Sequence, residues 1–98
     1  MANVELDIKQ LEKAADRLSA IAHPLRIAII SLLEDHDTLS VTDIYMKLKI
    51  SQPTASHHLA ILKSKGILIS NKEGKQIFYS LHYENILKTL ESVDKSNY

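Results

Sequence analysis

A segment between residues 51 and 64 holds side chains whose types and spacing favour contact with nucleic acid. If this segment is a helix with 100° per residue, Ala55, Leu59 and Leu62 share one apolar face. The opposite face and the N-terminal end then carry small or hydrogen-bonding side chains and no acid: Gln52, Pro53, Thr54, Ser56, His57, Ala60 and Ser64. Small residues let a helix backbone approach base edges, where amide, hydroxyl and imidazole groups form hydrogen bonds. The pattern favours a DNA-reading helix, and an ordinary solvated face is the alternative.

The bounds of this helix follow from its flanking residues. Ser51 is a candidate N-cap, because its hydroxyl can accept a hydrogen bond from a backbone N–H of the first turn. Pro53 falls in that first turn, where a missing N–H costs little. The helix is expected to run to about Lys65 and to stop at Gly66.

A shorter helix is expected just before it. Ser40 and Asp43 have the spacing of a capping box in its weaker Asp form, and they predict a helix that ends near Leu48. Only Lys49 and Ile50 join this helix to the next one. Two helices with so short a connection predict a helix-turn-helix, whose second helix enters the major groove.

A β-hairpin is predicted directly after these helices. Residues 67–69 and 76–81 are β-prone, and residues 70–75 between them are expected to form a turn. Lys72 and Lys75 lie at the tip of this two-stranded hairpin. A basic hairpin beyond a recognition helix is typical of the wing of a winged helix, and a solvated turn is the alternative.

The remaining chain is predicted to form three more helices. A first helix over residues 4–22 carries an apolar stripe that steps by three and four: Val4, Ile8, Leu11, Ala15, Leu18 and Ala22. A second begins at Pro24, is apolar on nearly all sides and should be buried. A last helix over about residues 83–94 carries the stripe Tyr83, Ile86, Leu87, Leu90 and Val93. The fold class is mainly α, a winged helix-turn-helix of order α-α-α-α-β-β-α.

Composition limits the class of protein. With 98 residues and 45% hydrophobic side chains, residues 1–98 are expected to form a single domain. The formal net charge is zero, yet residues 51–80 hold Lys63, Lys65, Lys72 and Lys75 against Glu73 alone. No apolar run is long enough to span a bilayer and the first residues lack a signal pattern, so we expect a cytoplasmic protein without a membrane partner.

Three segments resemble the ArsR/SmtB-type family of winged-helix repressors. The string SQPTASHHLAILKSKGIL at 51–68 is similar to the recognition helix and strand entry of these proteins. KEGKQIFYSL at 72–81 resembles their wing, and AHPLR at 22–26 resembles the opening of their second helix. The resemblance spans about residues 18–82, and the pattern S-Q-x-T-x-S-H-H-L is specific.

The resemblance implies a DNA-binding repressor that is a homodimer on double-stranded DNA with a two-fold symmetric operator. The two terminal helices, 4–22 and 83–94, would form the dimer interface. The implied DNA-binding residues, with the lysines that the local charge adds, are Gln52, Pro53, Thr54, Ser56, His57, Lys63, Lys72 and Lys75. Of these, Gln52, Pro53, Ser56 and His57 would face bases, and Thr54 and the wing lysines would lie near the backbone. His58 and Arg26 are expected to be mainly structural.

The family's usual metal sites are expected to be absent. The resemblance places one site at a Cys-x-Cys pair, where this chain has Ser40 and Thr42, and hydroxyls are poor ligands for soft metals. A second site begins with an Asp-x-His pair, where this chain has Tyr83-Glu84-Asn85, and Ser96 is no replacement for the later ligands. Asp35-His36-Asp37 is a cluster that we expect to be a solvated loop. We therefore expect no metal and no cofactor, and no residue identifies a small-molecule effector.

Two other functions are alternatives to a DNA-binding regulator. A winged helix can act only as a protein-interaction module, but this chain keeps both the polar helix face and the basic wing. An enzyme is not expected, because the chain has no cysteine nucleophile and no Gly-rich phosphate loop. The sequence identifies neither the operator nor the regulated genes.

Overall fold

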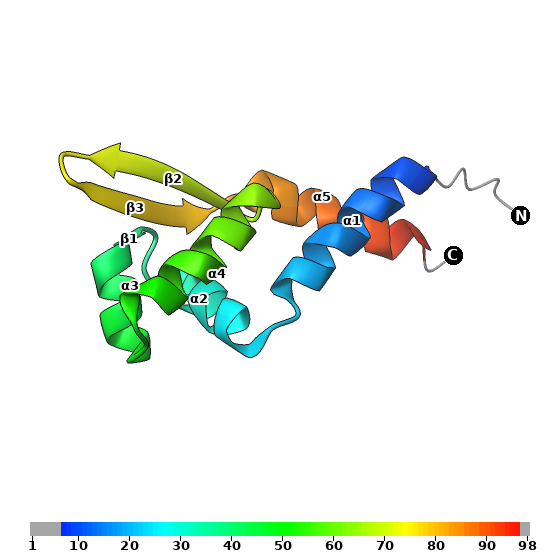
Figure 1. The fold of residues 1–98 in the computed structure, drawn as a ribbon. Helices are drawn as coiled ribbons and strands as arrows, with labels where there is room; N and C mark the ends of the chain where they lie inside the picture. The colour runs from blue at the N-terminus through cyan, green and yellow to red at the C-terminus, as the bar shows by residue number, and fades with distance from the viewer. Residues whose placement is uncertain (1–6, 97–98) are drawn as a thin grey trace, which may run out of the picture.

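The computed structural model describes residues 7–96 of the chain, with the side chains of residues 7–94 (Figure 1). Five helices and three strands follow one another in these residues: α1 (Ile8–Ile21), α2 (Pro24–Asp35), β1 (Leu39–Ser40), α3 (Val41–Leu48), α4 (Gln52–Ser64), β2 (Leu68–Glu73), β3 (Gln76–Leu81) and α5 (Tyr83–Ser96). The winged helix-turn-helix fold class predicted from the sequence is confirmed. Val4, the first residue of the predicted stripe, lies outside the described residues. Within them, no helix is both long and apolar enough to cross a bilayer.

Side-chain caps set where the helices begin. Asp7 accepts hydrogen bonds from the backbone N–H groups of Lys9 and Gln10 at the start of α1. His23 accepts one from the N–H of Leu25 at 3.2 Å, just before Pro24 opens α2. His82 accepts one from the N–H of Asn85 in α5. Each cap satisfies a backbone donor that the first helical turn leaves without a partner.

The wing is longer and tighter than the sequence predicted. β2 and β3 pair antiparallel from Leu68 with Leu81 to Glu73 with Gln76, so the turn consists only of Gly74 and Lys75. Gly74 has φ +62°, as the first residue of a type II′ turn requires. The prediction of a turn over residues 70–75 was wrong in extent, and Lys72 lies in a strand.

The sheet also has a strand that the sequence did not predict. Leu39 and Ser40 form β1, which pairs antiparallel with Tyr79 and Phe78 of β3. The strand order is β1-β3-β2, so β3 is central. This pairing connects the start of α3 to the middle of β3.

The core lies where α2, α3, α4 and the base of the sheet meet. Its fully buried large side chains are Ile29, Leu33, Ile44, Leu59, Leu62 and Ile67. In α2, however, Ile27 is 54% exposed. The prediction that α2 is buried on nearly all sides was therefore wrong for this face.

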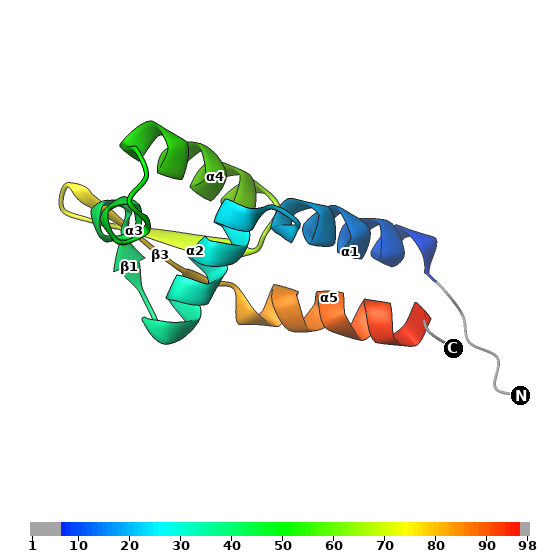
Figure 2. The same cartoon turned by 90° about the horizontal axis from the view of Figure 1, so that it is seen from below.

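α1 and α5 lie side by side and extend together from the body of the molecule (Figure 2). α1 buries Ala14 and Ala20, whereas Ile8 and Leu18 of its predicted stripe are exposed. Tyr83, Leu87 and Leu90 of α5 are exposed as well, and these five residues are called the terminal apolar face below. No residue that the structure describes covers this face.

Candidate nucleic-acid interface

Helix α4 divides into a buried face and an exposed face, as its sequence predicted. Ala55, Leu59 and Leu62 have no exposed surface and pack into the core. Exposed side chains cover the other side and the N-terminal end: Gln52, Pro53, Ser56, His57, Ala60 and Ser64. None of them is acidic, so this surface has nothing that repels a phosphate backbone.

The N-terminus of α4 is closed by Ser51. Its hydroxyl accepts a hydrogen bond from the N–H of Thr54 at 3.2 Å and donates one to Thr54 Oγ1 at 2.8 Å. Thr54 is half-buried and its hydroxyl already has a partner, so it is less available than the sequence suggested. Pro53 has no N–H, so the N–H of Gln52 is the donor that the first turn leaves at this helix end, where a phosphate is favoured.

The turn between α3 and α4 is fixed by backbone geometry. Lys49 adopts a left-handed conformation with φ 55° and ψ 43°, the one non-glycine residue with positive φ in the described chain. The N–H of Ile50 donates to the carbonyl of Tyr45 at 3.1 Å. These features end α3 and set the direction in which α4 leaves it.

His58 holds α4 against α2. It is 8% exposed, and its Nδ1 accepts a hydrogen bond from Arg26 Nε at 3.2 Å. Arg26 also donates to the carbonyl of Ala20 at 3.1 Å, and the His23 ring lies 4.5 Å from the His58 ring. Burial lowers the pKa of His58, and the nearby His23, Arg26 and His57 lower it further. These intramolecular contacts support a structural role for His58 and Arg26.

A groove of about 220 Å³ joins α4 to the wing and to α3. Gln52, Ser56 and Lys75 line it, so the fold brings two helix residues and one wing residue of the predicted set together. Ser40, Val41 and Thr42, at the start of α3, line its other side. This third side was not predicted from the sequence, although the Ser40–Asp43 capping spacing indicated that a helix begins there.

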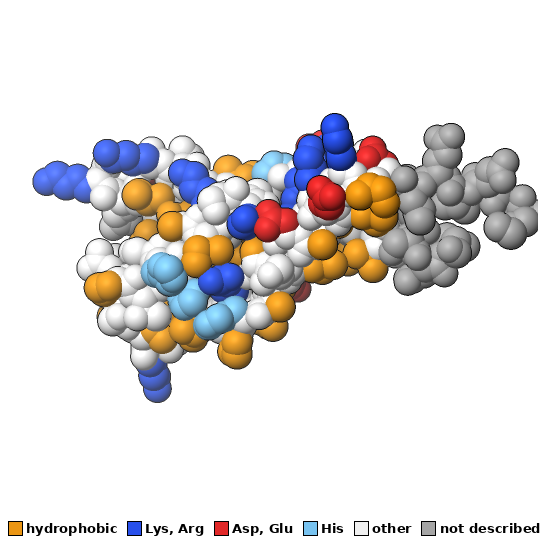
Figure 3. Space-filling model, turned by 45° about the vertical axis from the view of Figure 1, so that its right-hand side comes forward, with side chains coloured by type: hydrophobic (Ala, Val, Ile, Leu, Met, Phe, Trp, Pro, Cys, Tyr) orange, Lys and Arg blue, Asp and Glu red, His pale blue; other side chains and the backbone are white. Residues whose placement is uncertain are grey.

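The other predicted lysines lie apart from this groove. Lys63 is exposed in the last turn of α4, about 20° around the helix from Ser56 and therefore on the same face. Lys72 is exposed on β2. Lys65 pairs with Asp16 at 3.0 Å, which explains why it does not add to the free positive charge. Lys and Arg side chains project at the wing end of the molecule (Figure 3).

At positions where the resemblance places metal ligands, Ser40 and Asn85 form hydrogen bonds within the chain. Ser40 Oγ accepts a hydrogen bond from the N–H of Asp43 at 3.1 Å, so it serves as the cap of α3. The side-chain nitrogen of Asn85 donates to the carbonyl of Gly66 at 2.9 Å. Hydroxyls and an amide lack the charge and softness of thiolate or imidazole ligands. Across the described part of the chain, no three His, Asp or Glu side chains are grouped to hold an ion.

Fold and surface together define a winged helix-turn-helix protein of the DNA-binding class, and comparison with known proteins agrees. The family profile described as "Bacterial regulatory protein, arsR family" matches residues 23–70. An HTH-type transcriptional regulator of Methanocaldococcus jannaschii is 38% identical over 88 residues, which cover 90% of this chain and 99% of that protein. The transcriptional repressor PagR of Bacillus anthracis is 36% identical over 92 residues, which cover 91% of this chain and 92% of PagR.

Solved structures give the same result. The crystal structure of PagR has a TM-score of 0.72 at 38% identity and covers 86% of this chain and 99% of its own. HlyU of Vibrio cholerae has a TM-score of 0.70 at 33% identity, and the match covers 81% of this chain and 87% of HlyU. The chain belongs to the arsR family of bacterial regulatory proteins. It is a DNA-binding transcriptional regulator and not an enzyme.

Proposed function

We propose that this regulator is a homodimer that inserts one α4 helix per subunit into the major groove of a two-fold symmetric operator. The acid-free exposed face of α4 carries the proposal. Gln52, Ser56 and His57 supply groups that can pair with base edges, and Pro53 lets the backbone come close. Lys63, Lys72 and Lys75, with the N-terminus of α4 near Thr54, contact phosphates and set the position on the duplex.

The terminal apolar face supports the dimer. Leu87 and Leu90 are 58% and 56% exposed, and Ile8 is 61% exposed, on two helices that already lie side by side. Several large exposed apolar side chains on two adjacent helices are typical of a protein interface. Pairing it with the same face of a second copy removes it from water and gives the two α4 helices a common two-fold axis.

Repression is the proposed direction of control. Bound at a promoter, a dimer blocks access to the DNA that it covers. PagR is a repressor, whereas HlyU is described as a transcriptional activator, so the fold alone does not set the direction. No metal is assigned to the mechanism, because the residues at the family's metal positions do not fit one.

Selection of bound duplexes from a random-sequence pool tests this function. The expected result is a consensus of two inverted half-sites whose centres lie about one helical turn, or a multiple of it, apart. A reporter driven by a promoter that contains this consensus should then fall in output when the protein is expressed. Binding that selects no sequence, or a consensus without symmetry, contradicts the proposal and favours the interaction-module alternative or a monomer.

A further inference from the structure

A groove between α1 and α5 holds polar and basic side chains that the proposed DNA contacts do not use. It encloses about 410 Å³, which lies within the usual range of small-molecule sites. Its walls include Gln10, Lys13, Arg17, Asn85, Lys88 and Glu91. Three cations and one carboxylate give the groove a net positive charge.

Two of these cations have no carboxylate partner in the described part of the chain. Lys88 pairs with Glu84 at 3.2 Å, one turn back on α5. Neither Lys13 nor Arg17 forms an ion pair with any residue that the structure describes. Arg17 is half-buried, and its side chain donates one hydrogen bond, to Thr89 Oγ1 at 3.4 Å. A guanidinium has five N–H donors, so Arg17 keeps donors that can bind a carboxylate or phosphate in a bidentate way.

The groove is separate from the terminal apolar face. Around α1, Ile8 lies about 180° and Leu18 about 100° from Arg17. Around α5, Leu87 and Leu90 lie about 160° and 140° from Asn85. A second copy that covers the apolar face therefore does not use the cations of the groove.

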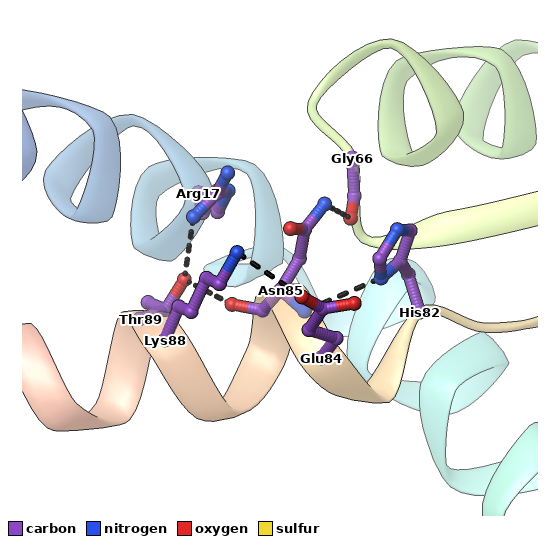
Figure 4. A network of polar contacts seen from close by, with 7 residues as sticks. All are labelled: Arg17, Gly66, His82, Glu84, Asn85, Lys88 and Thr89. Carbon is purple, nitrogen blue, oxygen red and sulfur yellow. Dashed lines mark hydrogen bonds and ion pairs between the residues drawn. The ribbon is translucent and has the colours of Figure 1, made fainter.

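Hydrogen bonds connect this groove to the end of the recognition helix (Figure 4). Thr89 Oγ1, which accepts from Arg17, donates to the carbonyl of Asn85 at 2.9 Å. The side-chain nitrogen of Asn85 donates to the carbonyl of Gly66, just beyond the last turn of α4. The Asn85 side chain lies close to the Gly66 backbone: a Cβ added to Gly66 would lie 2.9 Å from the Asn85 side-chain nitrogen. In Figure 4, Arg17 and Lys88 reach from their two helices into the space beside Asn85.

We propose that this groove binds a small-molecule oxyanion through Lys13 and Arg17, and that its occupancy shifts α4 through Asn85 and Gly66. An anion that draws Arg17 away from Thr89, or takes the amide N–H of Asn85, changes the contact that fixes the C-terminal end of α4. A ligand shifts a conformational equilibrium by its difference in affinity for the two states. The part of this proposal that concerns control of DNA binding rests on the proposed function. The part that concerns binding of the anion is independent of it.

Amide chemical shifts of the ¹⁵N-labelled full chain, titrated at constant ionic strength, test the site. Pyrophosphate and citrate are the two probes, and the one that saturates separates phosphate from carboxylate recognition. Lys13→Gln and Arg17→Gln should each weaken binding about tenfold, because each removes a charge-assisted contact. Lys9→Gln removes the same charge from an exposed position of α1 outside the groove and should leave the affinity unchanged. Lys13 forms no hydrogen bond or ion pair among the described residues, so its variant separates loss of a ligand from loss of folding.

Three results would overturn the site: no saturation with either probe, equal weakening by Lys9→Gln and Lys13→Gln, or shifts confined to the wing and the start of α4. The last would mean that the probe occupies only the DNA surface. The coupling is read in the same titration, since saturation should shift Gly66 and α4 in the wild type but not in Asn85→Ala. Unchanged α4 shifts at saturation contradict the coupling. Failure to bind any selected duplex contradicts the proposed function instead.

Discussion

At the residue scale, Ser56 and His57 are the side chains that we propose to read bases. Both are exposed on an acid-free helix face, and Ser56 also lines the groove that contains Lys75. This face could be predicted from the sequence, because a helix with three apolar residues at fixed spacing leaves only one side for its polar ones. The sequence could not predict which hydroxyls remain free to contact DNA, because the hydrogen bond from Ser51 to Thr54 Oγ1 depends on the geometry of the cap.

His57→Ala is expected to weaken binding to the selected operator by about 1–3 kcal/mol per subunit contact, the usual cost of a lost base contact. His36→Ala is the matched control, because His36 is an exposed histidine in the loop after α2. Fluorescence anisotropy at one fixed salt concentration measures both. Equal losses in the two variants would remove His57 from the interface.

The free energy of unfolding is expected to fall as the pH drops below about 6.5. Burial lowers the pKa of His58 in the folded protein, so the unfolded chain takes up a proton first. The stability that this gives is complete above the unfolded pKa and is lost as the pH falls through the folded one. Urea unfolding between about pH 7.5 and about pH 5 measures the slope.

His58→Gln supplies the control for this pH dependence. A glutamine oxygen can still accept the hydrogen bond from Arg26, but it does not titrate. Because His23 and His57 also face His58, the comparison is made with His57→Gln as a second variant. A slope that His58→Gln leaves unchanged would contradict the assignment.

At the element scale, the turn between α3 and α4 carries a measurable strain. Lys49 has φ 55°, a region that costs a residue with a Cβ roughly 1–2 kcal/mol. Lys49→Gly should therefore stabilise the fold by up to about 1 kcal/mol. Lys47→Gly, inside α3, should instead destabilise it by about 1 kcal/mol. Thermal and urea unfolding compare the pair, and a destabilising Lys49→Gly would show that the geometry is not strained.

The elements that the sequence predicted well are those with strong local signals. Ser40 and Ser51 both cap their helices as expected, because capping depends on residues three positions apart. β1 was missed because a two-residue strand is defined only by its distant partner β3. The length of β2 was missed because its outer half is exposed and has no alternating apolar pattern.

At the scale of the whole molecule, the apolar stripes of α1 and α5 gave the right helices but not the internal packing. Inside the chain α1 buries Ala14 and Ala20, whereas Ile8 and Leu18 stay exposed. Periodicity shows that a face is apolar and cannot distinguish contact within a chain from contact between chains. The polar groove beside this face carries no local sequence signal, because its residues come from two helices nearly 70 positions apart.

Leu90→Lys should raise the dimer dissociation constant at least about tenfold, since it places a charge within an apolar interface. Ile27→Lys changes an equally exposed apolar residue on α2, outside the terminal apolar face, and should leave the assembly unchanged. Sedimentation velocity measures both, with circular dichroism as the check on folding. A monomeric wild type, or a dimer lost equally in both variants, contradicts the proposed interface.

The most direct test of which DNA contacts α4 and the wing make is the affinity of the wild type and two variants for the selected operator, measured base by base. Wild type, Ser56→Ala and Lys75→Ala would be measured on duplexes in which each pair of symmetric base pairs is changed in turn. Ser56→Ala should lose discrimination at one position of each half-site. Lys75→Ala should weaken every duplex alike and reduce the salt slope by about one per lost phosphate contact. If both variants weaken all duplexes uniformly, the exposed face of α4 does not read the bases.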